Sequence, residues 1–327
     1  MRNTLLFVIA FSLYCLLVSC EKKDRSITLP PKGDGSVLQV DMGATYEFQY
    51  YISLANNAIV HISPTKNWDL AFSCDPNSHA VFMNGAKLMS AINTHKTNFA
   101  DVGVADTLDK SHEWKYDNAS GLIDSTVIGD WKNKNEIFLI KLNSVGNKVR
   151  KIRFVSEDIF EFKIEVADFP SAIPTTITIP KRADHNYTYF SFDMLAEVEE
   201  VEPNKSGWDL QITLYNYTFY DQNPVLPYIV NGVLLNPNGT SACKDSLTGY
   251  TTIDGNFAST LTLSERKDVI GFDWKSYDID KNLYTVNDKY SYVIKTQSGS
   301  YFKLRFLDFY SSSGVKGSPK FEFEQIK

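Results

Sequence analysis

The chain has 327 residues and a formal net charge of −6, and it is long enough for two ordinary domains. Because it lacks a basic excess, nucleic acid is not an expected partner. The 21 Phe and 18 Tyr residues favour an all-β protein, since long helix-forming stretches are absent. We expect a protein that is not an enzyme, because the nucleophile elbow, the zinc-protease motif, the phosphate-binding glycine loop and the dinucleotide fingerprint are missing.

The N-terminus has the pattern of an exported lipoprotein. Arg2 precedes an apolar run over residues 5–18, and Leu17-Val18-Ser19-Cys20 resembles the lipobox of bacterial lipoproteins. We expect a signal peptide over residues 1–19, lipidation at Cys20 and a polar tether from Cys20 to residue 36. Glu21, which stands where an inner-membrane lipoprotein has Asp, favours the outer membrane with the folded part facing the exterior. An ordinary signal peptide with an incidental cysteine is the alternative.

The clearest strand signals form a hairpin near the C-terminus. Between Tyr290 and Tyr310, aromatic and apolar residues alternate with polar ones on both sides of Ser298-Gly299. This pattern predicts two antiparallel strands and a tight turn. Residues 136–154 show a related pattern, in which Lys151-Ile152-Arg153-Phe154 corresponds to Lys303-Leu304-Arg305-Phe306.

A second signature also occurs twice. Trp68-Asp69-Leu70 precedes Asn84-Gly85, and Trp208-Asp209-Leu210 precedes Asn231-Gly232; both Asn-Gly pairs are predicted turns. We therefore predict one β unit used twice, over residues 37–168 and 176–327, with a Pro-punctuated linker over residues 169–175. Two side-by-side antiparallel β domains are expected.

Two cysteines remain in the mature chain beyond Cys20. Cys74 lies in the first unit and Cys243 in the second. A disulfide between them would cross the two units, and two isolated thiols are the equal alternative. The cysteine pattern gives no support for a zinc site.

The motifs of the second unit, taken together, resemble those of a known family. The second unit contains, in this order, Tyr189-Phe190-Ser191-Phe192, then Trp-Asp-Leu, then a hairpin with Tyr292-Val293-Ile294-Lys295 and the Lys-Leu-Arg-Phe strand. This order of motifs is similar to that of the HmuY family of surface lipoproteins. The second unit matches best and the first more weakly. The resemblance implies an all-β haem-binding protein, anchored in outer-membrane lipid, that hands haem to a TonB-dependent receptor.

The resemblance also implies where the haem ligands lie. In the family, two His or Met side chains from the segment between the Trp-Asp-Leu strand and the final hairpin hold the iron. The second unit has neither residue type in that segment, whereas the first has candidates. We expect His95 and His112 as ligands, with Met83 or Met89 as substitutes. Loop histidines are otherwise usually solvated surface residues, and Met83 on a strand is otherwise a core residue.

Loop aromatics offer a further set of candidates. Trp114, Tyr116, Trp274 and Tyr277 either stack on a flat ligand or a sugar, or close the mouth of each β domain. Haem capture is the leading function. A surface adaptor or glycan-binding lipoprotein that keeps the fold is the alternative, followed by a purely structural surface protein.

Overall fold

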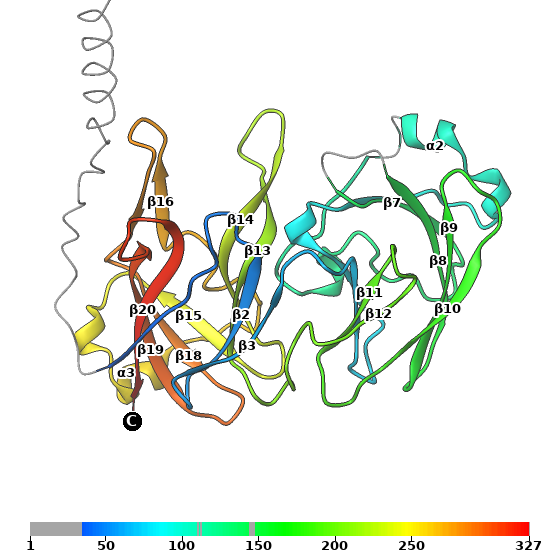
Figure 1. Cartoon of the computed structure of the whole chain (residues 1–327). Helices are drawn as coiled ribbons and strands as arrows, with labels where there is room; N and C mark the ends of the chain where they lie inside the picture. The colour runs from blue at the N-terminus through cyan, green and yellow to red at the C-terminus, as the bar shows by residue number, and fades with distance from the viewer. Residues whose placement is uncertain (1–34, 110, 112, 144–147, 327) are drawn as a thin grey trace, which may run out of the picture.

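The computed structural model describes residues 35–109, 111, 113–143 and 148–326, so the predicted signal peptide, Cys20 and most of the predicted tether lie outside the described residues. The described chain is almost entirely antiparallel β structure, which confirms the all-β prediction. Figure 1 shows two β bodies side by side. We call them the terminal body (residues 35–64 and 208–326) and the central body (residues 69–198).

The terminal body contains a five-stranded and a four-stranded sheet that pack around one hydrophobic core. A small hairpin projects from it beside the long hairpin of the four-stranded sheet (Figure 1). The strands, in sheet order, are β1 (Ser36–Gln39), β20 (Lys316–Ile326), β19 (Tyr301–Tyr310), β18 (Ser291–Lys295) and β15 (Ser241–Asp245); then β14 (Leu226–Leu235), β13 (Leu210–Phe219), β2 (Phe48–Ser53) and β3 (Ala58–Pro64); and in the small hairpin β16 (Lys275–Asp278) and β17 (Leu283–Val286).

The central body repeats this arrangement around its own core. Its strands, in sheet order, are β10 (Thr175–Pro180), β9 (Glu161–Asp168), β8 (Val149–Glu157), β7 (Ile137–Lys141) and β6 (Ser90–Asn93), and then β12 (Ala196–Val198), β11 (Tyr187–Ser191), β4 (Leu70–Ser73) and β5 (Val81–Met83).

The described helices are all short, and none is long and apolar enough to cross a membrane. They are η1 (Gly85–Lys87), η2 (Phe99–Asp101), α2 (Val104–Leu108), η3 (Ile123–Ser125), η4 (Tyr250–Thr252) and α3 (Gly255–Thr260). The polar stretch from Asn84-Gly85 to Asp130 therefore contains β6 and four of these helices. Their short apolar segments give too little periodicity to be recognised in the sequence.

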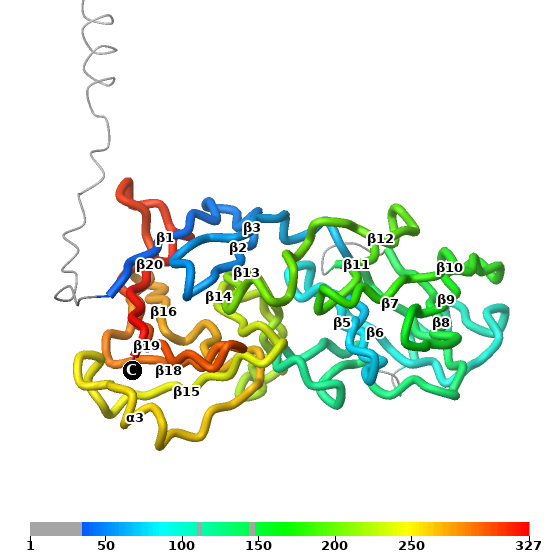
Figure 2. The backbone as a smooth tube through the Cα atoms, turned by 90° about the horizontal axis from the view of Figure 1, so that it is seen from below, coloured from blue at the N-terminus to red at the C-terminus, as the bar shows by residue number. Residues whose placement is uncertain are grey.

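The two sequence units exchange hairpins in space. β2 belongs to the first unit but pairs with β13 of the second, with Ile52 opposite Leu210. β11 belongs to the second unit but pairs with β4 of the first, with Thr188 opposite Phe72. Figure 2 shows the consequence: the blue hairpin β2–β3 lies in the terminal body and the green strands β11 and β12 lie in the central body. The expected side-by-side domains are present, but each one combines strands of both units.

Matching polar contacts in the two bodies support the duplication. The Asp69 carboxylate accepts a hydrogen bond from Phe192 N (2.7 Å), and the Asp209 carboxylate accepts one from Leu54 N (2.8 Å). Each bond joins one unit to the exchanged hairpin of the other. The repeated Trp-Asp-Leu signature therefore holds the exchanged strands in place.

The predicted Asn231-Gly232 turn is wrong. Both residues lie inside β14, and the structural counterpart of Asn84 is Asn236, whose amide donates to Trp208 O (2.7 Å) as the Asn84 amide donates to Trp68 O (2.9 Å). Gly232 is needed for a different reason. A Cβ there would lie 2.5 Å from Gly271 O, so a glycine permits this close backbone approach.

The two cysteines are unpaired. Cys74 lies in the central body, where its thiol is 3.4 Å from the Thr188 hydroxyl, whereas Cys243 lies on β15 of the terminal body. The structure therefore has two isolated thiols at these positions and no disulfide between Cys74 and Cys243.

Candidate functional site

One edge of the central body carries the predicted ligand His95. The residue follows β6, has φ of +55° and is 66% exposed at its side chain. Its Nδ1 lies 3.1 Å from Glu136 Oε1, and the other oxygen of Glu136 accepts a hydrogen bond from the Asn93 amide (2.7 Å). Burial raises the pKa of Glu136, but the hydrogen bonds from Asn93 and His95 outweigh this effect and lower the pKa overall. An ionised carboxylate therefore orients the His95 ring at the rim.

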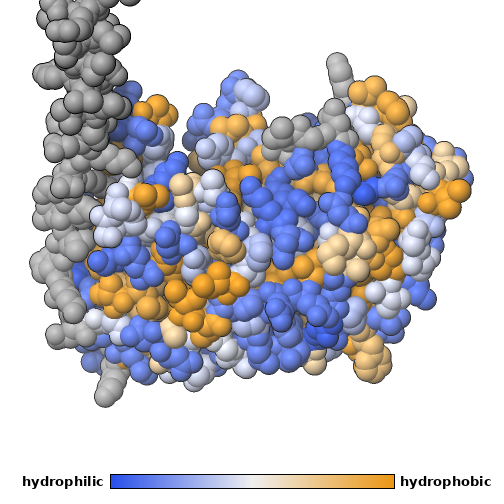
Figure 3. Space-filling view, viewed as in Figure 1, coloured by the Kyte–Doolittle hydropathy of each residue, from blue (hydrophilic) through white to orange (hydrophobic). Residues whose placement is uncertain are grey.

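Apolar side chains lie exposed beside His95. The Lys96 ammonium is 2.6 Å from Asp106 Oδ1, which ties α2 to the loop that carries His95. On α2, the side chains of Val104 and Leu108 are 57% and 74% exposed. In Figure 3, hydrophobic residues gather at this upper right corner of the molecule, where Figure 1 shows α2. A histidine and an apolar surface thus share one edge.

The segment before Lys115 leads to the same edge. Lys115 and Ala91 exchange two backbone hydrogen bonds (2.9 and 3.0 Å), so the chain at Lys115 runs antiparallel to β6. His112 precedes this pairing by three residues and lies outside the described residues. Trp114 is half-buried against a small apolar cluster, and the Lys141 ammonium lies 4.0 Å from its ring centroid. Tyr116 is also half-buried.

The two methionine candidates lie elsewhere. Met83 and Met89 are 5% and 2% exposed and both pack in the central core between the two sheets. Their thioethers therefore do not reach a ligand at the surface. The prediction that either one substitutes as a haem ligand does not fit this placement, whereas the alternative role as core residues does.

Of the two aromatic candidates in the second unit, Trp274 is buried and Tyr277 is exposed. Trp274 is fully buried and stacks on Phe306 with ring centroids 3.9 Å apart. Of the two alternatives for Trp274, this burial does not fit stacking on a ligand, because the ring packs inside the terminal core. Tyr277 is 45% exposed and contacts Tyr284, 4.7 Å away between ring centroids.

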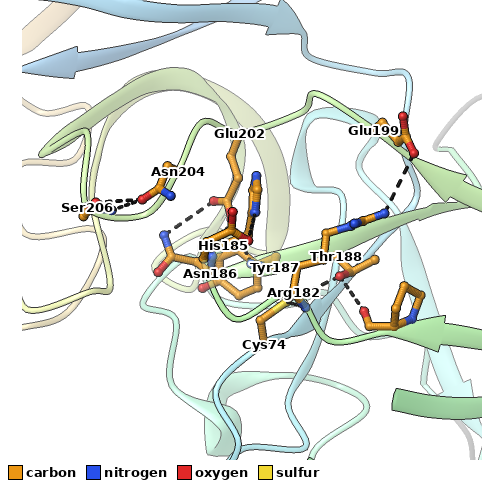
Figure 4. A network of polar contacts seen from close by, with 12 residues as sticks. Cys74, Arg182, His185, Asn186, Tyr187, Thr188, Glu199, Glu202, Asn204 and Ser206 are labelled. Carbon is orange, nitrogen blue, oxygen red and sulfur yellow. Dashed lines mark hydrogen bonds and ion pairs between the residues drawn. The ribbon is translucent and has the colours of Figure 1, made fainter. Parts of the chain in front are cut away.

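A buried polar cluster that the sequence did not indicate lies where the two bodies meet. Glu202 is 3% exposed and accepts hydrogen bonds from Asn186 N (2.6 Å) and Tyr187 N (2.8 Å). Figure 4 shows Glu202 with His185 and Asn186 at its side. Burial raises the pKa of Glu202 to about 7, although these hydrogen bonds and the nearby His185 and Lys267 act to lower it. The glutamates around this cluster, with Arg182, line an open groove of about 560 Å³.

The raised pKa of Glu202 gives a testable pH dependence. The folded state keeps a proton on Glu202 up to about pH 7, whereas an unfolded chain releases it near its ordinary value of 4.5. Folding is therefore disfavoured progressively as the pH rises from 4.5 to 7. Relative to Glu202→Gln, the wild-type free energy of unfolding should fall by up to about 3 kcal/mol over this range, at about 1.4 kcal/mol per pKa unit. Urea unfolding of both proteins at several pH values measures the difference. A difference independent of pH would contradict the burial of this carboxyl group.

Comparisons with known proteins agree with the repeated fold. The family model described as HmuY protein matches residues 45–171 and 183–323. The chain belongs to the HmuY family. The two matched segments also support two tandem HmuY-like units. No curated protein matches the sequence.

Several solved structures resemble this HmuY-family chain. Apo PinO from Porphyromonas gingivitis is 12% identical, with 90% of this chain and 99% of that chain covered and a TM-score of 0.27. The apo HmuY analog of Tannerella forsythia is 12% identical, with 90% and 96% covered and a TM-score of 0.26. A protein of Bacteroides vulgatus, described as HmuY-like and heme-binding, is 14% identical, with 53% and 90% covered and a TM-score of 0.22.

Proposed function

We propose that this HmuY-family chain is a lipoprotein that captures haem at the His95 edge of the central body. It is anchored in the outer membrane through Cys20 and passes the haem to a TonB-dependent receptor. The observation that carries the proposal is the pairing of Lys115 with Ala91, because it directs the sequence that follows His112 alongside the strand that leads to His95. Membership of the HmuY family supports the choice of haem as the ligand.

The residues at this edge suit the chemistry of the group. Haem supplies an iron that takes axial imidazole donors and a flat porphyrin with apolar faces. His95 provides an exposed imidazole, and Glu136 orients the ring as the outer-shell carboxylates of metal-binding histidines do. Val104 and Leu108 provide apolar contacts that partly shield a flat ligand from water. These side chains are exposed, which suits a protein that hands its ligand on.

Substitution of the two histidines tests the proposal. In haemin titrations of the protein that begins after Cys20, His95→Ala and His112→Ala should each weaken binding by at least about tenfold and turn a low-spin spectrum high-spin. Glu136→Gln should weaken binding by about tenfold or more without removing a ligand, because it loosens the His95 ring. Soret and Q-band absorbance in the oxidised and reduced forms measures each effect.

A matched control separates ligation from a general histidine effect. His185 also pairs with a carboxylate, Asp184, at 2.8 Å, but it lies where the two bodies meet. His185→Ala should bind haemin as the wild type does. If all three histidine variants behave like the wild type, the proposed edge is not the haem site.

A further inference from the structure

Two hairpins of the terminal body, β13–β14 and β16–β17, project from it on the same side (Figure 1). Their strands are paired as far as Phe219 and Leu226 in the first hairpin and Asp278 and Leu283 in the second. We call these four residues and the turns between them the hairpin tips. Figure 3 shows an open notch between the two hairpins, so each tip stands clear of its neighbour.

The hairpin tips carry large apolar and aromatic side chains that face water. Tyr220 is 73% exposed and Ile279 is 81% exposed, and Val225 and Leu226 are each about half exposed. Three tyrosines on the strands below the tips are also exposed: Tyr217, Tyr228 and Tyr277. Turns usually carry small polar residues. A group of exposed apolar side chains at two neighbouring tips therefore indicates a surface that contacts a partner.

Aromatic contacts hold both hairpins in this position. Tyr217 packs against Phe272, with ring centroids 4.8 Å apart, and Tyr277 packs against Tyr284 at 4.7 Å. Tyr284 in turn contacts Phe309 of the terminal core at 4.8 Å. The tips are therefore supported from below, while the described part of the chain leaves their apolar side chains uncovered.

The charges of the tips disfavour an anionic partner. Lys281 is the single basic residue of the two tips, and its ammonium pairs with Asp278 at 2.9 Å. Asp221 and Asp280 have no ion-pair partner among the described residues, so the tips carry a negative excess. Tyrosine and large aliphatic side chains beside few charges suit a lipid surface without net charge, because tyrosine rings favour the membrane–water interface.

The length of the predicted tether agrees with a lipid surface at the tips, provided that Cys20 is lipidated as proposed above. The described chain begins at the end of the terminal body away from the tips (Figure 1), so the tether has to run along this body. Cys20 and Gly35 are 15 positions apart, and an extended chain of that length reaches about 50 Å. The longest strand of the body, β20, spans only about 35 Å. The anchor and the tips can therefore contact the same bilayer.

We propose that the hairpin tips insert their exposed side chains into the surface of the bilayer that holds the acylated Cys20. Ile279, Val225 and Leu226 contact the acyl chains, while the ring of Tyr220 lies at the level of the headgroups with its hydroxyl in water. A flexible tether alone leaves the folded part free to rotate. This second contact fixes the orientation of the terminal body on the membrane.

Vesicle flotation of the protein that begins after Cys20 tests the tips without the lipid anchor. Phosphatidylcholine vesicles at up to about 5 mM lipid should bind it saturably, since weak single anchors bind with constants near 10⁴ M⁻¹. Ile279→Asn and Tyr220→Ser should each weaken binding by at least about threefold, and the double variant by about tenfold or more, because less apolar surface leaves water. Replacing about a third of the lipid by phosphatidylglycerol should also weaken binding, because the acidic tips are repelled.

Two matched variants control for a general loss of exposed apolar surface. Leu247, between β15 and η4, is 95% exposed, and Phe160, between β8 and β9, is 71% exposed; both lie outside the tips. Leu247→Asn and Phe160→Ser should therefore bind vesicles as the wild type does.

The proposal is overturned if the wild type does not bind vesicles, in which case the tips serve a protein or a glycan instead. It is also overturned if the tip variants, folded by circular dichroism, bind like the wild type, or if phosphatidylglycerol strengthens binding. Haemin titration keeps this test separate from the haem proposal, because the tip variants should bind haemin normally. A tip variant that loses haemin binding would place haem at the tips and contradict both proposals.

Discussion

Asp69→Ala should lower the free energy of unfolding by about 3–5 kcal/mol, because it removes one partner of a buried ion pair. Asp69 is 1% exposed, contacts the Lys87 ammonium and accepts a hydrogen bond from Phe192 N. Without the carboxylate, the ammonium and the N–H of the exchanged hairpin are both left unsatisfied. Urea unfolding followed by Trp fluorescence gives the midpoint and the m-value from which the change is calculated.

The duplicated residue provides the control for this prediction. Asp209 accepts the equivalent hydrogen bond from Leu54 N but forms no ion pair among the described residues. Asp209→Ala should therefore cost only about 1–3 kcal/mol, the value for a buried donor left unpaired. If the two variants have the same unfolding free energy, the Lys87 contact does not contribute as we infer. If neither variant lowers the free energy of unfolding, the result contradicts the role of these hydrogen bonds in holding the exchanged strands.

Lys151→Ala should destabilise the central body by about 3–5 kcal/mol, because it leaves three carbonyl groups without their ammonium donor and a cavity in place of a buried side chain. Lys151 is fully buried on β8, and its ammonium donates to Phe99 O (2.8 Å), Val102 O (2.5 Å) and Pro170 O (3.2 Å). These bonds fasten the chain around η2 to the sheet. Hydrogen exchange of the η2 amides should increase along with the loss of stability measured in urea.

Two comparisons separate the role of the Lys151 charge from packing. Lys151→Met keeps the apolar stem and removes the ammonium, so it should cost less than alanine but more than a surface substitution. Lys163→Ala, on the exposed face of β9, should change the unfolding free energy by no more than about 0.5 kcal/mol. Faster exchange at η2 in the Lys163 variant, or none in the Lys151 variant, would refute the fastening role.

Side-chain alternation predicted much of the architecture. The hairpin of β18 and β19 and its counterpart β7 and β8 follow from aromatic and β-branched residues at every second position. The repeated Trp-Asp-Leu signature predicted the duplication because each copy makes the same contacts. The hairpin exchange could not be predicted, since equivalent strands of two copies carry the same pattern and fit either sheet. Which copy fills each position depends on the connections between strands, which carry no periodic signal.

The sequence also predicted the candidate site residues only in part. His95 is exposed as expected for a loop histidine, whereas Met89 and Trp274 are buried. Burial of a loop residue depends on which distant strands cover it, and sequence periodicity does not report this.

Haemin titration of the wild-type protein that begins after Cys20 tests the haem proposal most directly. We predict saturation at about one haem per chain with a low-spin spectrum in both the oxidised and the reduced form, because His95 and His112 would both hold the iron and two imidazole ligands would make it low-spin. A broad spectrum that keeps rising without saturation, as haemin gives on any apolar surface, would contradict haem capture by this chain.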